Sequence, residues 1–424
     1  MNGPLNVTLF DRSIGDLAIT GGRSPEDWCF TYQADYLSSA AVVPLSVALP
    51  LQRDSFTGAA VRNWFCNLLP EGGVRDTITA RLRIPHGDDF ALLAAIGGEC
   101  AGAVSIQSPS PQTEFPREEG DLETLLQLHG DDVGEGSWAL LGTRLRLSLA
   151  GAQDKIAVIA DPDGRLRLPG RDELSTHILK PDSRRFRGLR DFEALGLTLA
   201  HAIGLRVSAS RPVEVLGRPA LLIERYDRVA GSGQVQRLHQ EDFCQALGYP
   251  GEMKYQSQGG PGLARCSALI RQLGLGPAAV QGLLDWAVFN ALIGNADAHA
   301  KNLGLLCDRH GIRRLAPFYD LVPTVVLPET LVDRAPALQI GAATRVEAIT
   351  AEDWRMFAAQ SQYAPRFVLS RVISMADALL ERLVPVGEQL IEQGCDAKRM
   401  AHASRIIECH VRQLQAAAAV PYAS

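Results

Sequence analysis

The sequence lacks the features that would place a protein in a membrane or outside the cell. No uninterrupted apolar run reaches the roughly 20 residues that a membrane-spanning helix needs. The N-terminus has no basic segment followed by an apolar stretch, so we expect no signal peptide. The eight cysteines are scattered and contain no C-x-x-C pair, which is typical of reduced, buried thiols. These absences together predict a cytoplasmic protein.

An excess of positive charge is also missing. The 42 basic and 48 acidic residues give a formal net charge of −6. This balance argues against non-specific nucleic-acid binding by the whole surface. It leaves room for a local basic patch, for which Arg184–Arg190 is a candidate, although a short charge run is more often a solvated turn.

The chain is 424 residues long, enough for two or three domains, and its patterns change along its length. Residues 1–107 begin with short strands rich in β-branched and aromatic side chains and continue with helices. A polar, proline-rich stretch over 108–120 indicates a linker. Residues 121–226 are β-rich with one amphipathic helix at Leu189–Ile203, and residues 227–424 are mostly helical. A β-rich lobe followed by a helical lobe predicts an α+β fold of the bilobal kinase kind, preceded by a small β/α subdomain.

Two local predictions concern turns and helix boundaries. We expect the first two strands to be joined by a turn at Ser13–Gly15, where a glycine follows polar residues. We also expect a helix over Gln240–Leu247, the first of the helical lobe.

The most unusual stretch is Gly294–Asn302, which lies between two apolar segments. The apolar run Leu283–Ile293 predicts a buried helix before it, and Leu303–Leu306 predicts a short buried strand after it. Polar groups at the mouth of a core need partners, and these partners can be ligands. Five polar residues occupy the stretch: Asn295, Asp297, His299, Lys301 and Asn302.

The spacing of these polar residues favours phosphoryl transfer. Asp297 and Asn302 are five residues apart, as are the catalytic-loop Asp and the magnesium-binding Asn of protein kinases. Asp320, in Phe318–Leu321, stands where a second metal-binding aspartate is expected. A carboxylate can orient the acceptor hydroxyl, and hard oxygen ligands suit magnesium. Asp297 fits the first role, and Asn302 and Asp320 fit the second.

Upstream residues could supply the positive charge that a nucleotide needs. Lys180 lies inside an apolar strand, where an amine requires an anionic partner. Glu193, on the following helix, is a possible partner, or else a plain surface glutamate. The loop Ser148–Lys155 contains Gly151 and small residues that let the backbone approach phosphates, and Lys155 adds charge. A lone Asp/Asn pair is usually a turn or a helix cap. That interpretation is weak here, because Lys180 lies upstream and Asp320 downstream of the pair, in the same order as in protein kinases.

Six motifs in this chain resemble those of the HipA-type serine/threonine kinase toxins of bacterial toxin–antitoxin systems. The resemblance spans about residues 5–415 and includes Pro44–Pro50 and Asn67–Glu71 in the N-terminal unit. The six motifs are Ser148–Lys155, Thr176–Pro181, Glu224–Arg228, Leu238–Phe243, Gly294–Asn302 and Pro317–Leu321.

The resemblance implies roles for particular residues, with ATP and Mg²⁺ as cofactors. Asp297 would be the catalytic base, Asn302 and Asp320 the magnesium ligands, and Lys180 a phosphate ligand. Ser148 would be autophosphorylated, which would expel the phosphate loop and switch the kinase off. The residues expected around ATP are Ala150, Gly151, Ala152, Gln153, Asp154 and Lys155 in the loop, Lys180, the hinge residues Glu224, Arg225 and Tyr226, and His299, Lys301, Asn302 and Tyr319.

The resemblance also implies partners. A helix-turn-helix antitoxin of the HipB type would neutralise the kinase and carry most of the contact with operator DNA. The protein substrate would be a translation component such as an aminoacyl-tRNA synthetase. Two alternatives stay open: a small-molecule kinase of the aminoglycoside-phosphotransferase type, and a non-catalytic corepressor that binds antitoxin and DNA.

Overall fold

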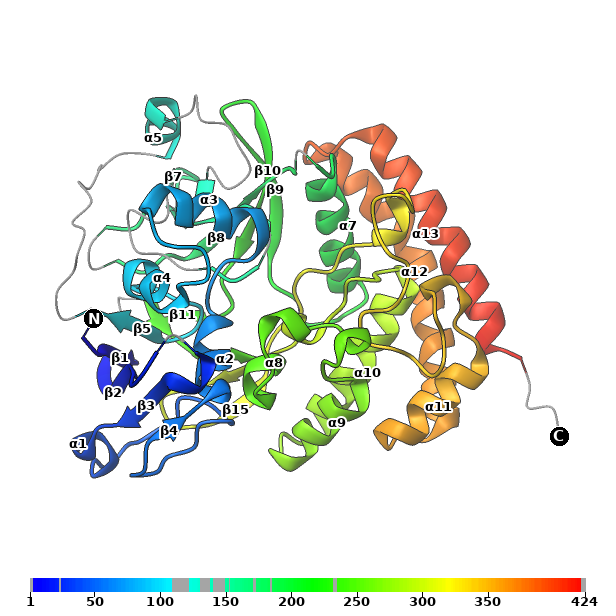
Figure 1. Cartoon of the computed structure of the whole chain (residues 1–424). Helices are drawn as coiled ribbons and strands as arrows, with labels where there is room; N and C mark the ends of the chain where they lie inside the picture. Colours follow the sequence, from blue (N-terminus) through cyan, green and yellow to red (C-terminus); the bar gives the residue numbers. More distant parts are fainter. Residues whose placement is uncertain are drawn as a thin grey trace.

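The computed structural model describes most of the chain (Figure 1). Ser148, Ala152 and nearly all of the expected linker lie outside the described part. Within it, no helix is both long and apolar enough to cross a membrane. The described residues are 3–22, 24–108, 122–129, 138–139, 149–151, 153–170, 173–183, 185–231 and 235–420.

The N-terminal unit is an antiparallel sheet covered by short helices. Its strand order is β4-β3-β2-β1-β5. β1 and β3 alternate buried and half-buried residues, as expected for a sheet with one face on a core. The elements are β1 (Leu5–Leu9), β2 (Arg12–Ile19), a 3₁₀ turn (Pro25–Asp27), β3 (Trp28–Tyr32), α1 (Ala34–Leu37), β4 (Phe56–Thr57), α2 (Ala59–Cys66), α3 (Gly72–Leu82), α4 (Asp89–Ile96) and β5 (Val104–Gln107).

The turn between β1 and β2 is not at the predicted place. Phe10 and Asp11 form it, with φ values of 51° and 64°, and Ser13–Gly15 lies inside β2. Two consecutive residues of positive φ match the twist of a two-residue hairpin. The prediction was wrong because it relied on glycine, whereas an aromatic residue and an aspartate adopt the left-handed conformation here.

The second sheet belongs to the β-rich lobe and has the order β7-β6-β8-β10-β9. β8 lies at its centre, so a side chain on β8 is held by strands on both sides. Lys180 on β8 pairs in register with Leu221 on β10. The elements of this part are α5 (Leu122–His129), β6 (Ile156–Ala160), β7 (Leu166–Arg167), β8 (His177–Pro181), α7 (Leu189–Ala202), β9 (Ser210–Val215) and β10 (Arg218–Glu224).

The rest of the chain forms the helical lobe, which also contains a two-stranded and a three-stranded sheet. The helices are α8 (Phe243–Leu247), α9 (Leu263–Gln272), α10 (Pro277–Leu292), α11 (Ala351–Ser361), α12 (Pro365–Glu392) and α13 (Ala397–Ala418). The strands are β11 (Arg228–Ala230), β12 (Val235–Arg237), β13 (His239–Asp242), β14 (Gly304–Cys307) and β15 (Arg313–Leu315). Short 3₁₀ turns lie at Gly251–Met253, Gln256–Gln258, Ala300–Asn302, Thr324–Val326 and Val346–Ala348.

The predicted helix over Gln240–Leu247 is wrong in its first half. His239–Asp242 is a strand that pairs with Gly304–Cys307, and the helix begins only at Phe243. Asp242 caps that helix by accepting a hydrogen bond of 2.8 Å from the amide of Gln245. The cap therefore sets the boundary between strand and helix.

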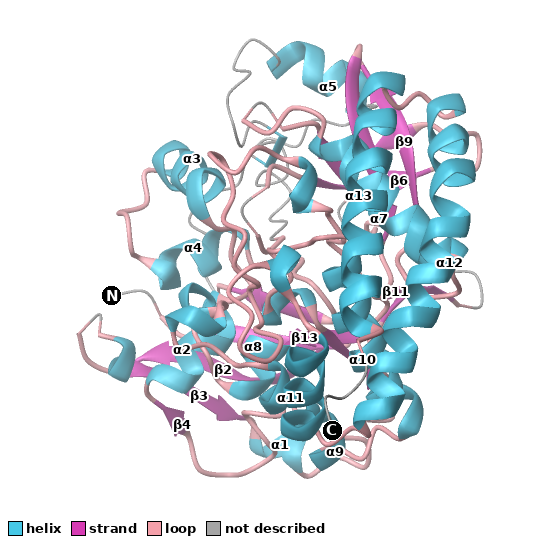
Figure 2. Ribbon diagram, turned by 90° about the vertical axis from the view of Figure 1, so that its right-hand side faces the viewer, coloured by secondary structure: helices cyan, strands magenta, loops and turns pink. Residues whose placement is uncertain are grey.

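The helix α7 follows the β-rich lobe in sequence but shares its core with the helical lobe. Phe192, Leu195 and Leu199 belong to the same buried cluster as α10, α12 and α13. Figures 1 and 2 show α7 beside α12 and α13. At Gly196 the helix approaches the carbonyl of Leu321 so closely that a Cβ would collide with it. This contact holds α7 against the segment that contains Asp320.

Buried ion pairs join the N-terminal unit to the kinase body. Glu99 Oε1 lies 3.1 Å from Nη1 of Arg225 and 2.8 Å from Nη2 of Arg228. Asp227 accepts a hydrogen bond of 2.6 Å from the amide of Gly102 and pairs with Arg225 at 2.8 Å. The two parts therefore meet through charged groups that have little access to water.

Candidate active site

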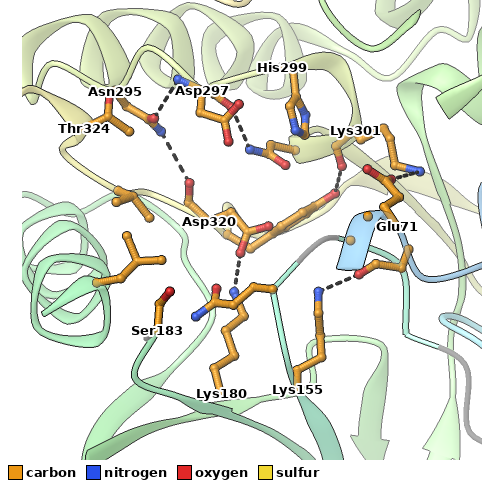
Figure 3. Close-up of a pocket in the computed structure, with 18 of the residues that line it drawn as sticks. Glu71, Lys155, Lys180, Ser183, Asn295, Asp297, His299, Lys301, Asp320 and Thr324 are labelled. Atoms are coloured by element: carbon orange, nitrogen blue, oxygen red, sulfur yellow. Dashed lines mark hydrogen bonds and ion pairs between the residues drawn. The ribbon is translucent and has the colours of Figure 1, made fainter. Parts of the chain in front are cut away.

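A cavity of about 1140 Å³ gathers the residues that the sequence pointed to (Figure 3). The N-terminal unit, the β-rich lobe and the helical lobe all contribute to its wall. Glu193 lies directly behind the wall, in contact with Lys180. Ser148 and Ala152 lie outside the described residues. The predicted residues in the wall are Ala150, Gly151, Gln153, Asp154, Lys155, Lys180, Glu224, Arg225, Tyr226, Asp297, His299, Lys301, Asn302, Tyr319 and Asp320.

Asn295 holds the loop after α10 in shape. Its Nδ2 donates to Asn290 Oδ1 at 2.7 Å and to the carbonyl of Asp320 at 3.3 Å. Its Oδ1 accepts from the amide of Asp297 at 3.1 Å. One buried amide side chain thus connects α10, the Asp297 turn and the Asp320 segment.

Asp297 is exposed to the cavity, whereas its neighbours on both sides are buried. The hydroxyl of Tyr255 donates to its Oδ1 at 2.6 Å, and Nδ2 of Asn302 donates to its carbonyl oxygen at 3.2 Å. Tyr255 also packs edge-on against His299. The sequence did not indicate Tyr255, because no local motif links it to Asp297.

Lys180 reaches two carboxylates from the centre of the β sheet. Its Nζ lies 2.7 Å from Glu193 Oε1 and also pairs closely with Oδ1 of Asp320. Burial opposes its charge, but the two carboxylates outweigh this and raise the pKa of Lys180 above its usual range. The chain segment of Asp320 is fixed by Asn295 and by the contact with α7 described above.

The two carboxylates differ in their own ionisation. Burial opposes ionisation of Asp320, but Lys180 and Lys155 together lower its pKa well below the usual range. Burial is the larger effect at Glu193 and raises its pKa. Asp320 also has φ = 53°, a left-handed conformation that costs a non-glycine residue on the order of 1–2 kcal/mol. The surrounding contacts therefore hold Asp320 in an unfavourable backbone conformation. In this conformation its charged side chain lines the cavity.

The loop beside Lys180 contributes Lys155 and Asp154 to the cavity (Figure 3). Lys155 Nζ donates to the carbonyl of Ala150 at 2.5 Å, which closes the loop on itself. Burial and the neighbouring Lys180 lower the pKa of Lys155 to about 8. The carboxylate of Asp154 accepts from the amides of Trp138 and Ala139, so it anchors the loop.

The hinge between the lobes, residues 224–226, lines the cavity. Arg225 turns to Glu99 and Asp227. The amide of Tyr226 has no acceptor among the described residues. The ring of Tyr226 stacks on that of Tyr319 at 5.5 Å, and the Tyr319 hydroxyl donates to the carbonyl of Lys301 at 2.7 Å.

Lys301 and His299 line the cavity in different ways. The Lys301 ammonium turns to the N-terminal unit, where Asn67 Oδ1 lies at 2.6 Å and Glu71 Oε1 at 3.1 Å. His299 is buried, which lowers its pKa to about 4 and leaves it neutral at pH 7.

The oxygens of Asn302 and Asp320 fit a magnesium ion. Asn302 uses Nδ2 as its donor, which leaves Oδ1 available as a ligand. Asp320 is a carboxylate of low pKa in the same cavity. Mg²⁺ prefers such oxygens, with one or two protein ligands and the rest from water and phosphate.

Over most of its length the chain is similar in sequence to known proteins of one family. The HipA N-terminal domain family matches residues 5–107, and the HipA-like C-terminal domain family matches residues 147–384. The protein Y4mE of Sinorhizobium fredii is 38% identical over 94% of this chain and 95% of its own length. The serine/threonine-protein kinase toxin HipA of Shewanella oneidensis is 30% identical over 75% of this chain and 74% of its own length.

The solved structures give the same result. HipA of Shewanella oneidensis, in complex with HipB and operator DNA, superposes with a TM-score of 0.81 at 25% identity and covers 98% of both chains. The α+β kinase-like fold predicted from the sequence is confirmed. The chain belongs to the HipA family of kinases.

Proposed function

We propose that this chain is an ATP- and magnesium-dependent serine/threonine protein kinase that acts as the toxin of a type II toxin–antitoxin system. The observation that carries the proposal is the meeting of Lys180, Asp297, Asn302 and Asp320 in one cavity, although these residues come from three separate chain segments. Phosphoryl transfer requires mainly positioning and charge neutralisation, and this set supplies both.

The residues of the chain would divide the work as follows. The open amide of Tyr226 binds the adenine edge, and Lys180 binds the phosphates while Glu193 holds it in place. Asp297 accepts a hydrogen bond from the acceptor hydroxyl and takes its proton as the phosphate is transferred. Tyr255 already occupies one oxygen of Asp297, which turns the other oxygen to the acceptor. Asn302 and Asp320 would hold Mg²⁺, which neutralises charge on the phosphates when bound.

The partners follow from the relatives. The HipA structure similar to this chain contains HipB and operator DNA, so we propose a helix-turn-helix antitoxin of the HipB type as partner. The net charge of −6 is consistent with DNA contact made mainly by that antitoxin. The proposed substrate is a translation component such as an aminoacyl-tRNA synthetase, and the proposed compartment is the cytoplasm.

Self-inactivation at Ser148 is the remaining part of the proposal. The adjacent residues Leu149–Gly151 line the cavity, so a phosphate on Ser148 would bring about −1.5 to −2 charges near the place of the ATP phosphates. Repulsion between these charges would expel the loop.

One experiment tests the catalytic proposal. The parent chain and its Asp297→Asn variant are incubated with Mg²⁺ and ATP, and phosphate on Ser148 and on co-purified host proteins is measured by mass spectrometry. We expect transfer by the parent and a loss on the order of 10²-fold or more in the variant, since the base that accepts the proton is gone. Antitoxin binding by both proteins serves as the folding control. Equal toxicity of parent and variant would favour the non-catalytic corepressor instead.

A further inference from the structure

The segment Asn67–Glu71, between α2 and α3, extends from the N-terminal unit into the wall of the active-site cavity. Glu71 lines that cavity, and Figure 3 shows it beside Lys301 and near Lys155. The catalytic roles proposed above do not use this segment. A carboxylate in a nucleotide site repels the phosphates. Its presence there therefore requires another explanation.

The side chain of Glu71 joins two lysines of the helical lobe. Its Oε2 lies 2.9 Å from Lys254 Nζ, and its Oε1 lies 3.1 Å from Lys301 Nζ. Asn67 adds a further bond, with Oδ1 at 2.6 Å from Lys301 Nζ. Asn67 is itself fixed, because its Nδ2 donates at 2.9 Å to the carbonyls of Asn63 and Tyr249.

The backbone of the same residue holds the phosphate loop. The amide of Glu71 donates to the carbonyl of Gly151 at 3.0 Å, and Pro70 forms a parallel bridge with Gly151. One residue of the N-terminal unit thus contacts the phosphate loop through its main chain and the helical lobe through its carboxylate.

Both lysines are next in sequence to residues that hold Asp297. Lys254 precedes Tyr255, whose hydroxyl donates to the Asp297 carboxylate. Lys301 precedes Asn302, whose side chain donates to the Asp297 carbonyl. The carboxylate of Glu71 therefore fixes the chain at two points, each one residue away from a contact to Asp297.

The charge on Glu71 persists over the working pH range. Burial opposes its ionisation, but Lys301 and Lys254 outweigh burial and lower the pKa of Glu71 from 4.5 to about 2. The side chains of Lys301 and Lys254 are 6% and 16% exposed, so water competes weakly for them. Without Glu71, Lys254 would lose this ion pair. Lys301 would keep Asn67 and the carboxylate of Asp242, whose Oδ2 lies 3.7 Å from Lys301 Nζ.

We propose that Glu71 is a positioning residue for phosphoryl transfer: through Lys254 and Lys301 it holds Tyr255 and Asn302 on Asp297, while its amide holds the phosphate loop. This proposal rests on the kinase function proposed above. It makes the N-terminal unit part of the catalytic apparatus and not only a neighbouring fold.

The test uses Glu71→Gln in the full chain, which keeps the size of the side chain and the backbone bond to Gly151. We expect kcat for autophosphorylation to fall on the order of tenfold, with KM for ATP within about threefold, because the base is misplaced while the nucleotide site stays formed. Amide hydrogen exchange of the nucleotide-free protein should be faster in peptides covering residues 254–258 and 295–303 and unchanged in 149–155. Glu26→Gln, an exposed carboxylate of the same unit, is the control.

Two further variants keep the test decisive. Lys254→Met removes one partner at the more exposed side, and we expect Glu71→Gln combined with Lys254→Met to be little worse than Glu71→Gln alone. Parent-like kcat and parent-like exchange in Glu71→Gln would overturn the proposal, as would fully additive effects. If the parent transfers no phosphate, the kinase proposal fails, and the exchange rates alone decide whether Glu71 fixes the two segments.

Discussion

Lys155 and Lys180 occupy the same cavity, but their surroundings shift their pKa values in opposite directions. Lys180 contacts two carboxylates, whereas Lys155 donates to a carbonyl and faces the charge of Lys180. A lysine with a pKa of about 8 is partly neutral near physiological pH in the nucleotide-free protein. Bound phosphates would recharge it, so nucleotide binding and proton uptake should be linked.

This linkage predicts a pH dependence of ATP affinity. Above about pH 8, binding requires Lys155 to take up a proton, so the Kd of a non-hydrolysable ATP analogue should rise by up to about tenfold per pH unit. Below that pH the lysine is already charged, and the Kd should level off. Calorimetric titrations at several pH values measure this. Lys155→Met should bind more weakly at neutral pH and lose the dependence. A slope that persists in that variant would assign it to another group.

At this scale the sequence predicted the residues that lie in short motifs and missed those brought in by tertiary structure. Lys180, Asp297 and Asp320 carry recognisable spacing, and all three line the cavity. Tyr255 and Glu71 touch the same cavity from segments that have no spacing relation to Asp297. They become site residues only through the fold, and local patterns in a single sequence do not show which distant segments will be in contact.

Among the elements, α7 has the strongest influence on the site. It supplies Glu193 to Lys180, and it packs on the Asp320 segment at Gly196. Its core residues belong to the helical lobe, although the sequence places it within the β-rich lobe. The predicted helix was confirmed, with Leu189–Ala202 as its bounds, but amphipathic spacing could not reveal which lobe its apolar face would contact.

Gly196→Ala should therefore disturb both stability and nucleotide binding. The added methyl group collides with the backbone carbonyl of Leu321, which cannot rotate away as a side chain could. Such overpacking typically costs about 1–3 kcal/mol of the free energy of unfolding. We expect a lower thermal midpoint and weaker ATP-analogue binding, because α7 moves Glu193 away from Lys180. His201→Ala, on the exposed side of the same helix, is the matched control and should behave like the parent.

At the start of the helical lobe, local sequence patterns predicted a helix but missed the strand that precedes it. Phe243–Leu247 is helical as expected, but the preceding residues pair with β14, a strand more than fifty residues later in the chain. Sequence periodicity cannot show a strand whose hydrogen bonds depend on a distant partner. The misplaced β1–β2 turn has a different cause, because the left-handed residues there are Phe10 and Asp11 and not the glycine on which the prediction relied.

In the molecule as a whole, the N-terminal unit and the kinase body are joined by buried charges. Glu99 is about nine-tenths buried and accepts hydrogen bonds from Ser175, Arg225 and Arg228. Removing Glu99 would leave Arg225 and Arg228 to share the carboxylate of Asp227, and breaking a buried ionic network in this way is more costly than the network's net contribution to stability.

Glu99→Gln should consequently lower the stability of the whole protein by about 3–5 kcal/mol, because Arg225 and Arg228 lose a buried counter-charge. Because Arg225 lies beside the hinge residue Tyr226, ATP-analogue binding should weaken as well. Urea unfolding followed by fluorescence and by hydrogen exchange measures the first effect. Glu408→Gln, which alters a surface ion pair with Arg412, is the control and should change stability by less than about 1 kcal/mol. A similar effect from both variants would contradict the importance of this network.

The buried network around Glu99 also limits how this protein can be recombined with its relatives. A chimera that takes residues 5–107 from one homologue and the remainder from another would place carboxylates of one parent against arginines of the other. Because these side chains are buried, water could not stabilise a charge that lacks its partner. Such hybrids should fold only when Glu99 is combined with compatible residues at positions 225, 227 and 228. We therefore expect recombination between homologues to yield folded proteins only when the N-terminal unit and the kinase body have compatible charges at this contact.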